Sequence, residues 1–244
     1  MKIKYLGTGN MGGSQKNTAF VIDNHVLMDI GSGTLNSLRD SGLDTGDIDT
    51  LIITHWHVDH FGDMTNYLIR FFIRHALAKD DKKVTVIGPR GTRQKIKDQV
   101  AFFHGEEEMK NLFAGIEGRM SFVDLDWGKT WQGNGVKIEA FPVNHADSVS
   151  NGYLIEKNNK RFSFSGDTAM CDNLIKYLDN SDVAIWEAVS KDGLRPGHMN
   201  LVEIEQVAKD YPNKNFYLVH RGDFETKSVC PNIYFPTDGE EVEV

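Results

Sequence analysis

The sequence has few of the features that mark secreted, membrane-spanning or nucleic-acid-coating proteins. Its two cysteines, Cys171 and Cys230, are too few and too far apart for a disulfide framework or a paired zinc knuckle. No apolar run is long enough to span a bilayer, and the start, MKIKYLGTGN, lacks the apolar core of a signal peptide. With 27 Lys and Arg against 35 Asp and Glu, the formal charge of -8 argues against a long basic face that follows a nucleic-acid backbone. We therefore expect a cytoplasmic protein without a membrane partner.

The length and the apolar pattern indicate one α+β domain. A chain of 244 residues with 40% hydrophobic residues can bury one sizeable core, so we expect a single domain over 1–244. Apolar runs typical of strands lie at 3–6, 19–22, 26–28, 51–53, 84–87, 136–143, 153–155, 161–164, 183–186 and 216–219. Helical patterns lie at 34–41, 63–78, 92–103, 171–178 and 201–209. Strands in succession followed by strands punctuated by helices favour mixed sheets flanked by helices over a plain βαβ repeat.

A helical insertion is expected around residues 90–118. Its second part, 104–118, starts with the acidic run GEEEMKNLFAGIEG, and such a charge run is more often a solvated face than a binding site. The sequence leaves open whether this part is a lid over a site, a contact in a homodimer or a surface helix pair.

The stretch GTGNMG at residues 7–12 matches the G-x-G-x-x-G pattern of dinucleotide sites and follows a predicted strand. That mechanism needs a helix that begins at the glycines and a crossover to a parallel strand. Here GSQKNTAFVID returns to a strand within a few residues. We therefore reject a dinucleotide cofactor and interpret the glycines as a tight loop at the mouth of a site.

The most informative stretch is THWHVDHFGD at residues 54–63, which directly follows an apolar run. In an extended segment residues i and i+2 point to the same side, so His55, His57 and Asp59 can converge while His60 points differently. One short loop could thus supply two neighbouring metal positions with ligands suited to zinc, iron or manganese. The alternative is a polar surface loop, but four candidate ligands in six residues between a buried strand and a helix argue against it.

The pattern His-x-His-x-Asp-His resembles the signature of the metallo-β-lactamase superfamily. Later candidates follow in the expected order: His145 after IEAFPVN, Asp167 in FSFSGDT, His198 in RPGHMN and His220 at the end of FYLVH. The resemblance implies an αββα sandwich, with two mixed sheets packed face to face between helices. It also implies two divalent metal ions, zinc first and manganese or iron as alternatives. Their implied ligands are His55, His57 and His145 for the first metal and Asp59, His60 and His220 for the second, with Asp167 as the bridge.

This resemblance also implies the chemistry of a two-metal hydrolase with a bridging hydroxide. Asp59 would bind one metal and orient the hydroxide, and the sequence contains no G-x-S-x-G elbow for a protein nucleophile. His198 could simply cap the helix that begins near Asn200. In the ribonuclease Z branch and its phosphodiesterase relatives, however, a histidine at the matching position assists chemistry at the phosphate. We favour that role. Asp29, in LMDIGSG, resembles the family's Asp-x-Gly loop beside the site, and we interpret it as a supporting residue.

The substrate class is less well defined by the sequence. KYLGTGN, GPRGT and SGDT look most like the ribonuclease Z and small phosphodiesterase branch. The long arm of transfer-RNA processing members is missing, because only about twenty residues separate His145 from Asp167. We therefore expect a small-molecule phosphodiester, such as a cyclic nucleotide or nucleotide-like ester, and consider transfer RNA an unfavoured partner. The alternatives are a lactone or carboxylic ester hydrolase, a transfer-RNA 3′ endonuclease, a mononuclear iron redox enzyme and a metal-bound binding protein without activity.

The aromatic residues near the metal motif bear on the ester alternative. Trp56, Phe61, Met64, Phe71 and Phe72 could line an apolar pocket for a lactone, but their helical spacing is more typical of core residues.

Overall fold

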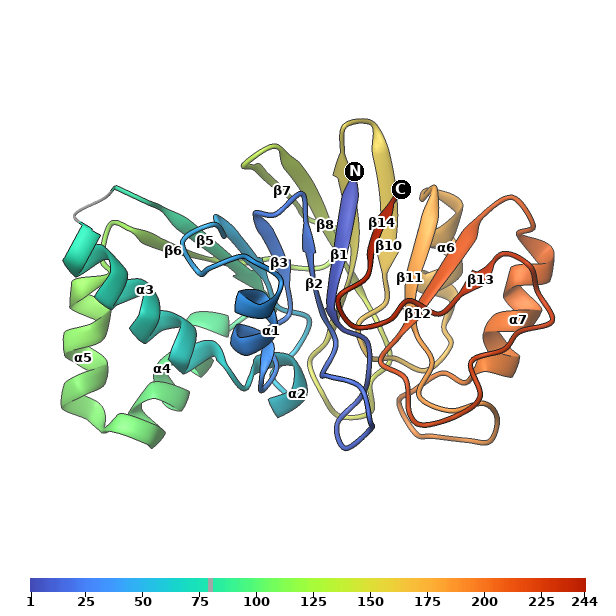
Figure 1. Cartoon of the computed structure of the whole chain (residues 1–244), viewed down its shortest axis with the longest axis horizontal. Helices are drawn as coiled ribbons and strands as arrows, with labels where there is room; N and C mark the ends of the chain where they lie inside the picture. The colour runs from blue at the N-terminus through green and yellow to red at the C-terminus, as the bar shows by residue number, and fades with distance from the viewer. Residues whose placement is uncertain (79–80) are drawn as a thin grey trace.

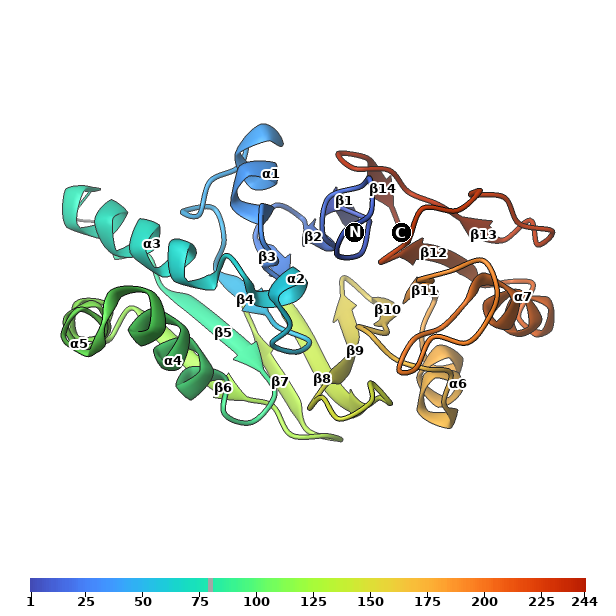
Figure 2. The ribbon, with the colours of Figure 1, turned by 90° about the horizontal axis from the view of Figure 1, so that it is seen from below.

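Two sheets packed face to face form the centre of the protein. The structure, a computed structural model, describes residues 1–78 and 81–244. Within these residues one 7-stranded sheet has the order β14-β1-β2-β3-β4-β5-β6, and the other has the order β13-β12-β11-β10-β9-β8-β7. Helices cover the outer face of each sheet (Figures 1 and 2). The αββα sandwich expected from the sequence is confirmed.

The bounds of the elements follow, sheet by sheet. The first sheet contains β1 (Lys2–Gly7), β2 (Ala19–Ile22), β3 (Val26–Met28), β4 (Thr50–Ile52), β5 (Val84–Gly88), β6 (Met120–Asp124) and β14 (Glu241–Glu243). The second contains β7 (Thr130–Gly133), β8 (Val136–Pro142), β9 (Asn151–Lys157), β10 (Lys160–Phe164), β11 (Val183–Glu187), β12 (Asn215–Val219) and β13 (Ile233–Tyr234). The helices are α1 (Thr34–Asp40), α2 (Val58–Phe61), α3 (Met64–Ala78), α4 (Thr92–His104), α5 (Glu106–Gly115), α6 (Asp172–Asp179) and α7 (Leu201–Asp210).

The period-two alternation of the strands fills separate layers of the core. In β2, Ala19 and Val21 belong to the cluster beneath α1, α3, α4 and α5, whereas Phe20 and Ile22 belong to the cluster between the sheets. All four side chains are buried, so the strand reads as a continuous apolar run. A third cluster lies beneath α6 and α7 and contains Trp186. The aromatic stripe is mostly core, because Phe61, Met64 and Phe71 are buried in the first cluster.

Strand direction brings the ends of several strands to one edge of the sandwich. Strands β3 to β6 are parallel to one another, and so are β10, β11 and β12. Strand β8 is antiparallel to β9, which is antiparallel to β10, so β8 and β10 run in the same direction. Loops that follow these carboxyl ends form the natural place for a site in a fold of this kind.

The strands missing from the predicted elements lie at the edges of the sheets. The pattern gave no strand for β6 and β7, which are edge strands with partly exposed faces, or for the short β13 and β14. The helical insertion corresponds to α4 and α5, whose Met109, Leu112 and Phe113 pack into the core. Figure 2 shows α5 far from α2. No helix in the described part of the chain has the length and apolarity needed to cross a membrane.

Candidate metal centre

Most of the candidate residues follow the carboxyl ends of strands from both sheets. His55 follows β4 in the first sheet, and His145, Asp167 and His220 follow β8, β10 and β12 in the second. The sandwich therefore brings together side chains from distant parts of the sequence. His220 has a φ of 52°, which a residue with a side chain rarely adopts. Such strained backbone is typical of functional sites.

Asp59 and His60 come from a helical turn, and the expectation of a fully extended motif is wrong for them. The chain is extended only as far as His57, which is the N-cap of α2. The helical turn that follows places Asp59 and His60 beside Asp167 and His220, so they do not share a group with His57. Gly31 makes this packing possible, since a Cβ at this position would lie 1.7 Å from the Asp59 carbonyl oxygen.

The first donor set consists of His55, His57, His145 and Asp167. His57 Nδ1 lies 3.0 Å from His55 Nε2 and 3.1 Å from His145 Nε2. One Asp167 oxygen, Oδ2, lies 3.7 Å from His55 Nε2 and 3.8 Å from His145 Nε2. Three imidazole nitrogens and a carboxylate oxygen therefore face a common point.

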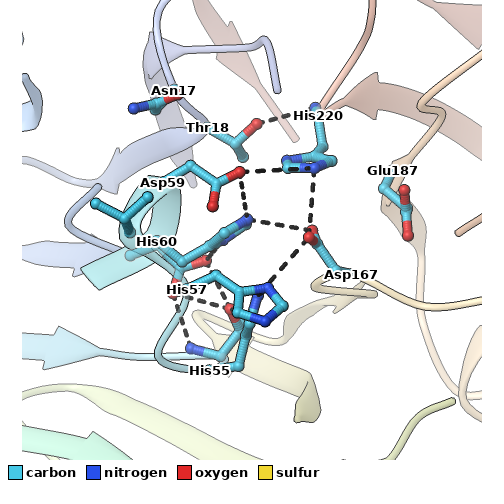
Figure 3. A network of polar contacts seen from close by, with 12 residues as sticks. Asn17, Thr18, His55, His57, Asp59, His60, Asp167, Glu187 and His220 are labelled. Atoms are coloured by element: carbon cyan, nitrogen blue, oxygen red, sulfur yellow. Dashed lines mark hydrogen bonds and ion pairs between the residues drawn. The ribbon is translucent and has the colours of Figure 1, made fainter. Parts of the chain in front are cut away.

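The second donor set consists of Asp59, His60, His220 and the same Asp167. Asp167 Oδ1 lies 3.2 Å from His60 Nε2, and Asp167 Oδ2 lies 3.3 Å from His220 Nε2. Asp59 Oδ2 lies 3.8 Å from His60 Nε2 and 4.0 Å from His220 Nε2. Figure 3 shows Asp167 between the two groups of side chains. Within each set the donor atoms lie within 4.8 Å of one another.

Both sets fit divalent cations. The nitrogen-to-nitrogen contacts cannot all be good hydrogen bonds, because a neutral imidazole carries only one N–H. His60 Nε2 and Asp167 Oδ1 are buried without a partner in hydrogen-bond geometry, although such atoms are normally satisfied. Imidazole nitrogens and carboxylate oxygens are ligands for zinc, manganese and iron. The structure thus brings together all seven residues that the sequence indicated as ligands.

A second layer of hydrogen bonds orients these imidazoles. Asp29 is fully buried, and its Oδ2 accepts a hydrogen bond from His60 Nδ1 at 2.8 Å. The Thr54 hydroxyl donates to the same oxygen at 2.8 Å and so can accept from His55 Nδ1 at 3.1 Å. The Gly197 carbonyl accepts from His145 Nδ1 at 2.9 Å. In all three histidines this arrangement leaves Nε2 with a free lone pair directed at the candidate centre.

Electrostatics favour neutral imidazoles around an ionised aspartate. Burial lowers the pKa of His55 well below its usual value and lowers the pKa of His220 to about 4. Burial alone would raise the pKa of Asp167, but the facing His220 and His60 outweigh it and hold the pKa well below the ordinary range. His60 is the exception, since Asp167 and Asp29 outweigh burial and raise its pKa. The groups are therefore largely in the forms that bind cations.

His198 lies beside this cluster, paired with a residue that sequence reasoning missed. Its Nδ1 lies 3.0 Å from Glu187 Oε2, and Glu187 is fully buried at the end of β11. Burial, followed by the nearby Asp167, raises the pKa of Glu187 well above its usual value. Burial also lowers the pKa of His198. The only sign of Glu187 in the sequence was its position directly after the apolar run VAIW.

The remaining histidines have other surroundings. His25 Nδ1 contacts Asp49 at 3.0 Å at the far end of the strands, and His104 is exposed at the end of α4. The side chain of His75 lies outside the described residues.

A cavity of about 410 Å³ opens onto the centre. Its walls include His57, Asp59, Asp167 and His198, together with Asn10 and Met11 from the glycine loop between β1 and β2. The glycine loop thus lies at the mouth of the site and leads into β2, which is antiparallel to β1. A dinucleotide site would need a crossover to a parallel strand instead.

Comparison with known proteins gives relatives by sequence. A family model described as a beta-lactamase superfamily domain matches residues 24–221. Ribonuclease Z of Mycobacterium bovis (strain BCG / Pasteur 1173P2) is 25% identical over 170 residues, which cover 68% of this chain and 60% of that protein. The match thus spans less than two thirds of that relative. Ribonuclease Z of Staphylococcus carnosus (strain TM300) is 25% identical over 252 residues, which cover 80% of this chain and 78% of that protein.

Solved structures with the same fold include YhfI of Bacillus subtilis, a metallo-beta-lactamase fold protein with a TM-score of 0.78 and 18% identity over 99% of this chain and 98% of that one. The short form of human tRNase Z has a TM-score of 0.76 and 21% identity over 100% and 99%. A diphosphatase of the PhnP family has a TM-score of 0.73 and 17% identity over 100% and 97%. At such identities the structures establish the fold alone. Because the family model covers most of the sequence, the chain belongs to the beta-lactamase superfamily and has the metallo-β-lactamase fold.

Proposed function

We propose that the protein is a metal-dependent hydrolase that cleaves a small phosphodiester with the help of two divalent cations. The observation that carries this proposal is the pair of four-donor sets that share Asp167. His55, His57 and His145 would hold one cation, Asp59, His60 and His220 the other, and Asp167 would contact both. When bound, such a cation pair lowers the pKa of a shared water toward neutrality and neutralises charge that develops on the attacked group.

The residues of the chain then have separate tasks. The buried anion of Asp167 holds the two donor sets next to each other, since Oδ2 faces His55 and His145 of the first set while Oδ1 faces His60 of the second. Asp59 lines the cavity and can accept a hydrogen bond from an attacking water through the oxygen that a cation leaves free. Six of the seven donor residues are buried, and the exposed His57 lines the cavity, so water reaches the donors mainly from the cavity side.

The pair of His198 and Glu187 favours phosphate chemistry. A protonated Glu187, favoured by its raised pKa, donates to His198 Nδ1 and leaves the proton on His198 Nε2. Since His198 lines the same cavity as Asp167, this N–H can bind a phosphoryl oxygen or protonate a leaving oxygen. As that proton passes to the leaving oxygen, the Glu187 proton moves to His198 Nδ1, so the histidine stays neutral and Glu187 is left as a carboxylate that regains a proton through His198 before the next turnover.

RNA is the second candidate substrate, because relatives by sequence are named ribonuclease Z. The missing arm made transfer RNA an unfavoured substrate, and this expectation therefore needs a direct test. Residues 151–164 between His145 and Asp167 are occupied by β9 and β10, so a gripping arm would have to come from elsewhere in the chain.

The test combines metal analysis with turnover on one sample. Elemental analysis should give about two metal ions per chain. Hydrolysis of bis(p-nitrophenyl) phosphate should fall on chelation and return with added metal. A lactone and a precursor transfer RNA are assayed in parallel, and faster turnover of either would replace the small phosphodiester as substrate. One metal or none, with no turnover after reconstitution, would contradict the proposal in favour of a mononuclear redox or a binding role.

His198→Ala separates the chemistry from metal binding. We expect phosphodiester turnover to fall by about 10²- to 10⁴-fold with metal content retained. His104→Ala is the matched control, because His104 is exposed and lies outside the cavity. If lactone hydrolysis is the main activity and the His198→Ala variant retains it, the carboxylic ester alternative would be favoured.

A further inference from the structure

A second cavity, of about 340 Å³, lies at the same edge of the sandwich as the candidate metal centre. Its walls include Pro89 and Arg90, which follow β5, and Leu125 and Trp127, which follow β6. Strands β4, β5 and β6 are parallel neighbours, so these residues and His55 all follow carboxyl ends at one edge. Val149, from the loop that begins at His145, forms another part of the wall.

Trp127 is exposed but held in a defined orientation. Its Nε1–H donates to Asn151 Oδ1 at 2.8 Å, and Asn151 is buried. Asn151 is itself fixed, because its Nδ2 donates to the Leu125 carbonyl at 3.3 Å and to Tyr153 Oη at 3.1 Å. The residue is nevertheless 55% exposed, and Val149 beside it is 50% exposed. An oriented and accessible indole is the kind of surface on which planar rings stack.

Short links in the chain place the walls of the two cavities near each other. Asn151 N–H donates to the carbonyl of Thr54, the residue directly before His55, at 3.0 Å. In the loop, Ser148 N–H donates to the His145 carbonyl at 2.9 Å and closes a turn. The ends of such a turn lie within about 7 Å. Since Val149 is one Cα step of about 3.8 Å further, it lies within about 11 Å of His145.

We propose that the Trp127 cavity is a specificity subsite that binds the aromatic ring of one ester group, such as the base of a nucleoside, while the phosphate lies at the metal centre. The subsite rests on the proposed function. The ring stacks on the indole and contacts Val149 and Pro89. The ion pair of Arg90 and Asp126, at 2.7 Å, forms a polar rim that faces the edge of the ring. A methyl ester would leave this cavity empty, so the enzyme distinguishes aromatic from small ester groups.

Two substrates with the same leaving group test this assignment. Bis(p-nitrophenyl) phosphate and methyl p-nitrophenyl phosphate both release p-nitrophenolate, but only the first carries a second ring. Trp127→Ala should lower kcat/KM for the diaryl ester by about tenfold, with the methyl ester and the metal content unchanged. Trp127→Phe should retain most of the preference. Phe102→Ala is the matched control, since Phe102 is an aromatic residue 82% exposed on α4 and outside both cavities.

Equal losses for the two substrates, or no change for either, would overturn the subsite. A binding readout keeps this result separate from the proposed function. Adenosine monophosphate, titrated by calorimetry into the metal-loaded protein, should bind about tenfold more weakly to the Trp127→Ala variant than to wild type or Phe102→Ala. If that difference appears while no ester is cleaved, the subsite stands and the hydrolase proposal fails. If esters are cleaved and the difference is absent from both assays, only the subsite fails.

Discussion

Replacement of Asp29 by asparagine should weaken both candidate metal positions although Asp29 belongs to neither donor set. The carboxylate accepts from His60 Nδ1 directly and is linked to His55 through the Thr54 hydroxyl. An amide nitrogen in place of Oδ2 would turn a donor toward His60 Nδ1. His60 must then carry its proton on Nε2, where the lone pair for the cation would be lost. Loss of such an outer hydrogen-bond partner typically lowers metal affinity by about 10- to 100-fold, or about 1.4 to 2.8 kcal/mol.

The assay is competition for zinc between the protein and a chromophoric chelator, with both binding steps fitted. Asp49→Asn is the matched control, because Asp49 makes a similar carboxylate-to-imidazole contact with His25 away from the site. Thr54→Val removes only the hydroxyl link, so it should weaken the position that contains His55 and spare the one that contains His60. Wild-type affinity at both positions in Asp29→Asn, with the fold intact by circular dichroism, would refute the reasoning.

Two further predictions concern stability. In the metal-free protein, prepared with a chelator, burial lowers the pKa of His220 to about 4. The pKa of a histidine in an unfolded chain is about 6.5. Between these values the unfolded state binds one more proton, so the contribution of His220 to stability declines as pH falls from about 6.5 to about 4. His220→Asn should make the free energy of unfolding less steep in this window by about 1.4 kcal/mol per pH unit, measured by urea unfolding, and an unchanged slope would contradict this. Asn200 caps α7 in a capping box with Glu203, so Asn200→Ala should cost about 1 kcal/mol with metal content retained. Asn213→Ala is its control, because Asn213 is exposed in a turn outside the helices, and equal urea midpoints for the two variants would contradict the role of the cap.

The sequence was a good guide to the fold wherever burial was two-sided. The fully buried strands β2 and β3 form uninterrupted apolar runs, which are not typical of a loop or a surface helix. Strand β7, with the sequence TWQG, pairs at one side only and carries exposed residues, so its pattern resembles that of a loop. The two residues of β13 are too few for any periodicity.

The candidate site was predictable in composition but not in local geometry. The histidine motif and the order of the later residues indicated the seven donors that the fold brings together. The motif could not show that α2 begins at Val58, because four helical residues carry no period of their own. Glu187 and Trp127 were missed for a different reason. Each follows or ends an ordinary strand, and its meaning depends on which strand lies beside it in space.

The placement of the donors after strands of both sheets has a consequence for biosynthesis. His55 follows a strand of the first sheet, and His220 follows β12, the last long strand of the second. A ribosome-bound chain that has not yet released β12 contains all four donors of the first set but lacks His220 of the second. The second set therefore forms late, after contacts of long sequence separation have closed. A chain truncated before β12 would therefore lack the complete centre.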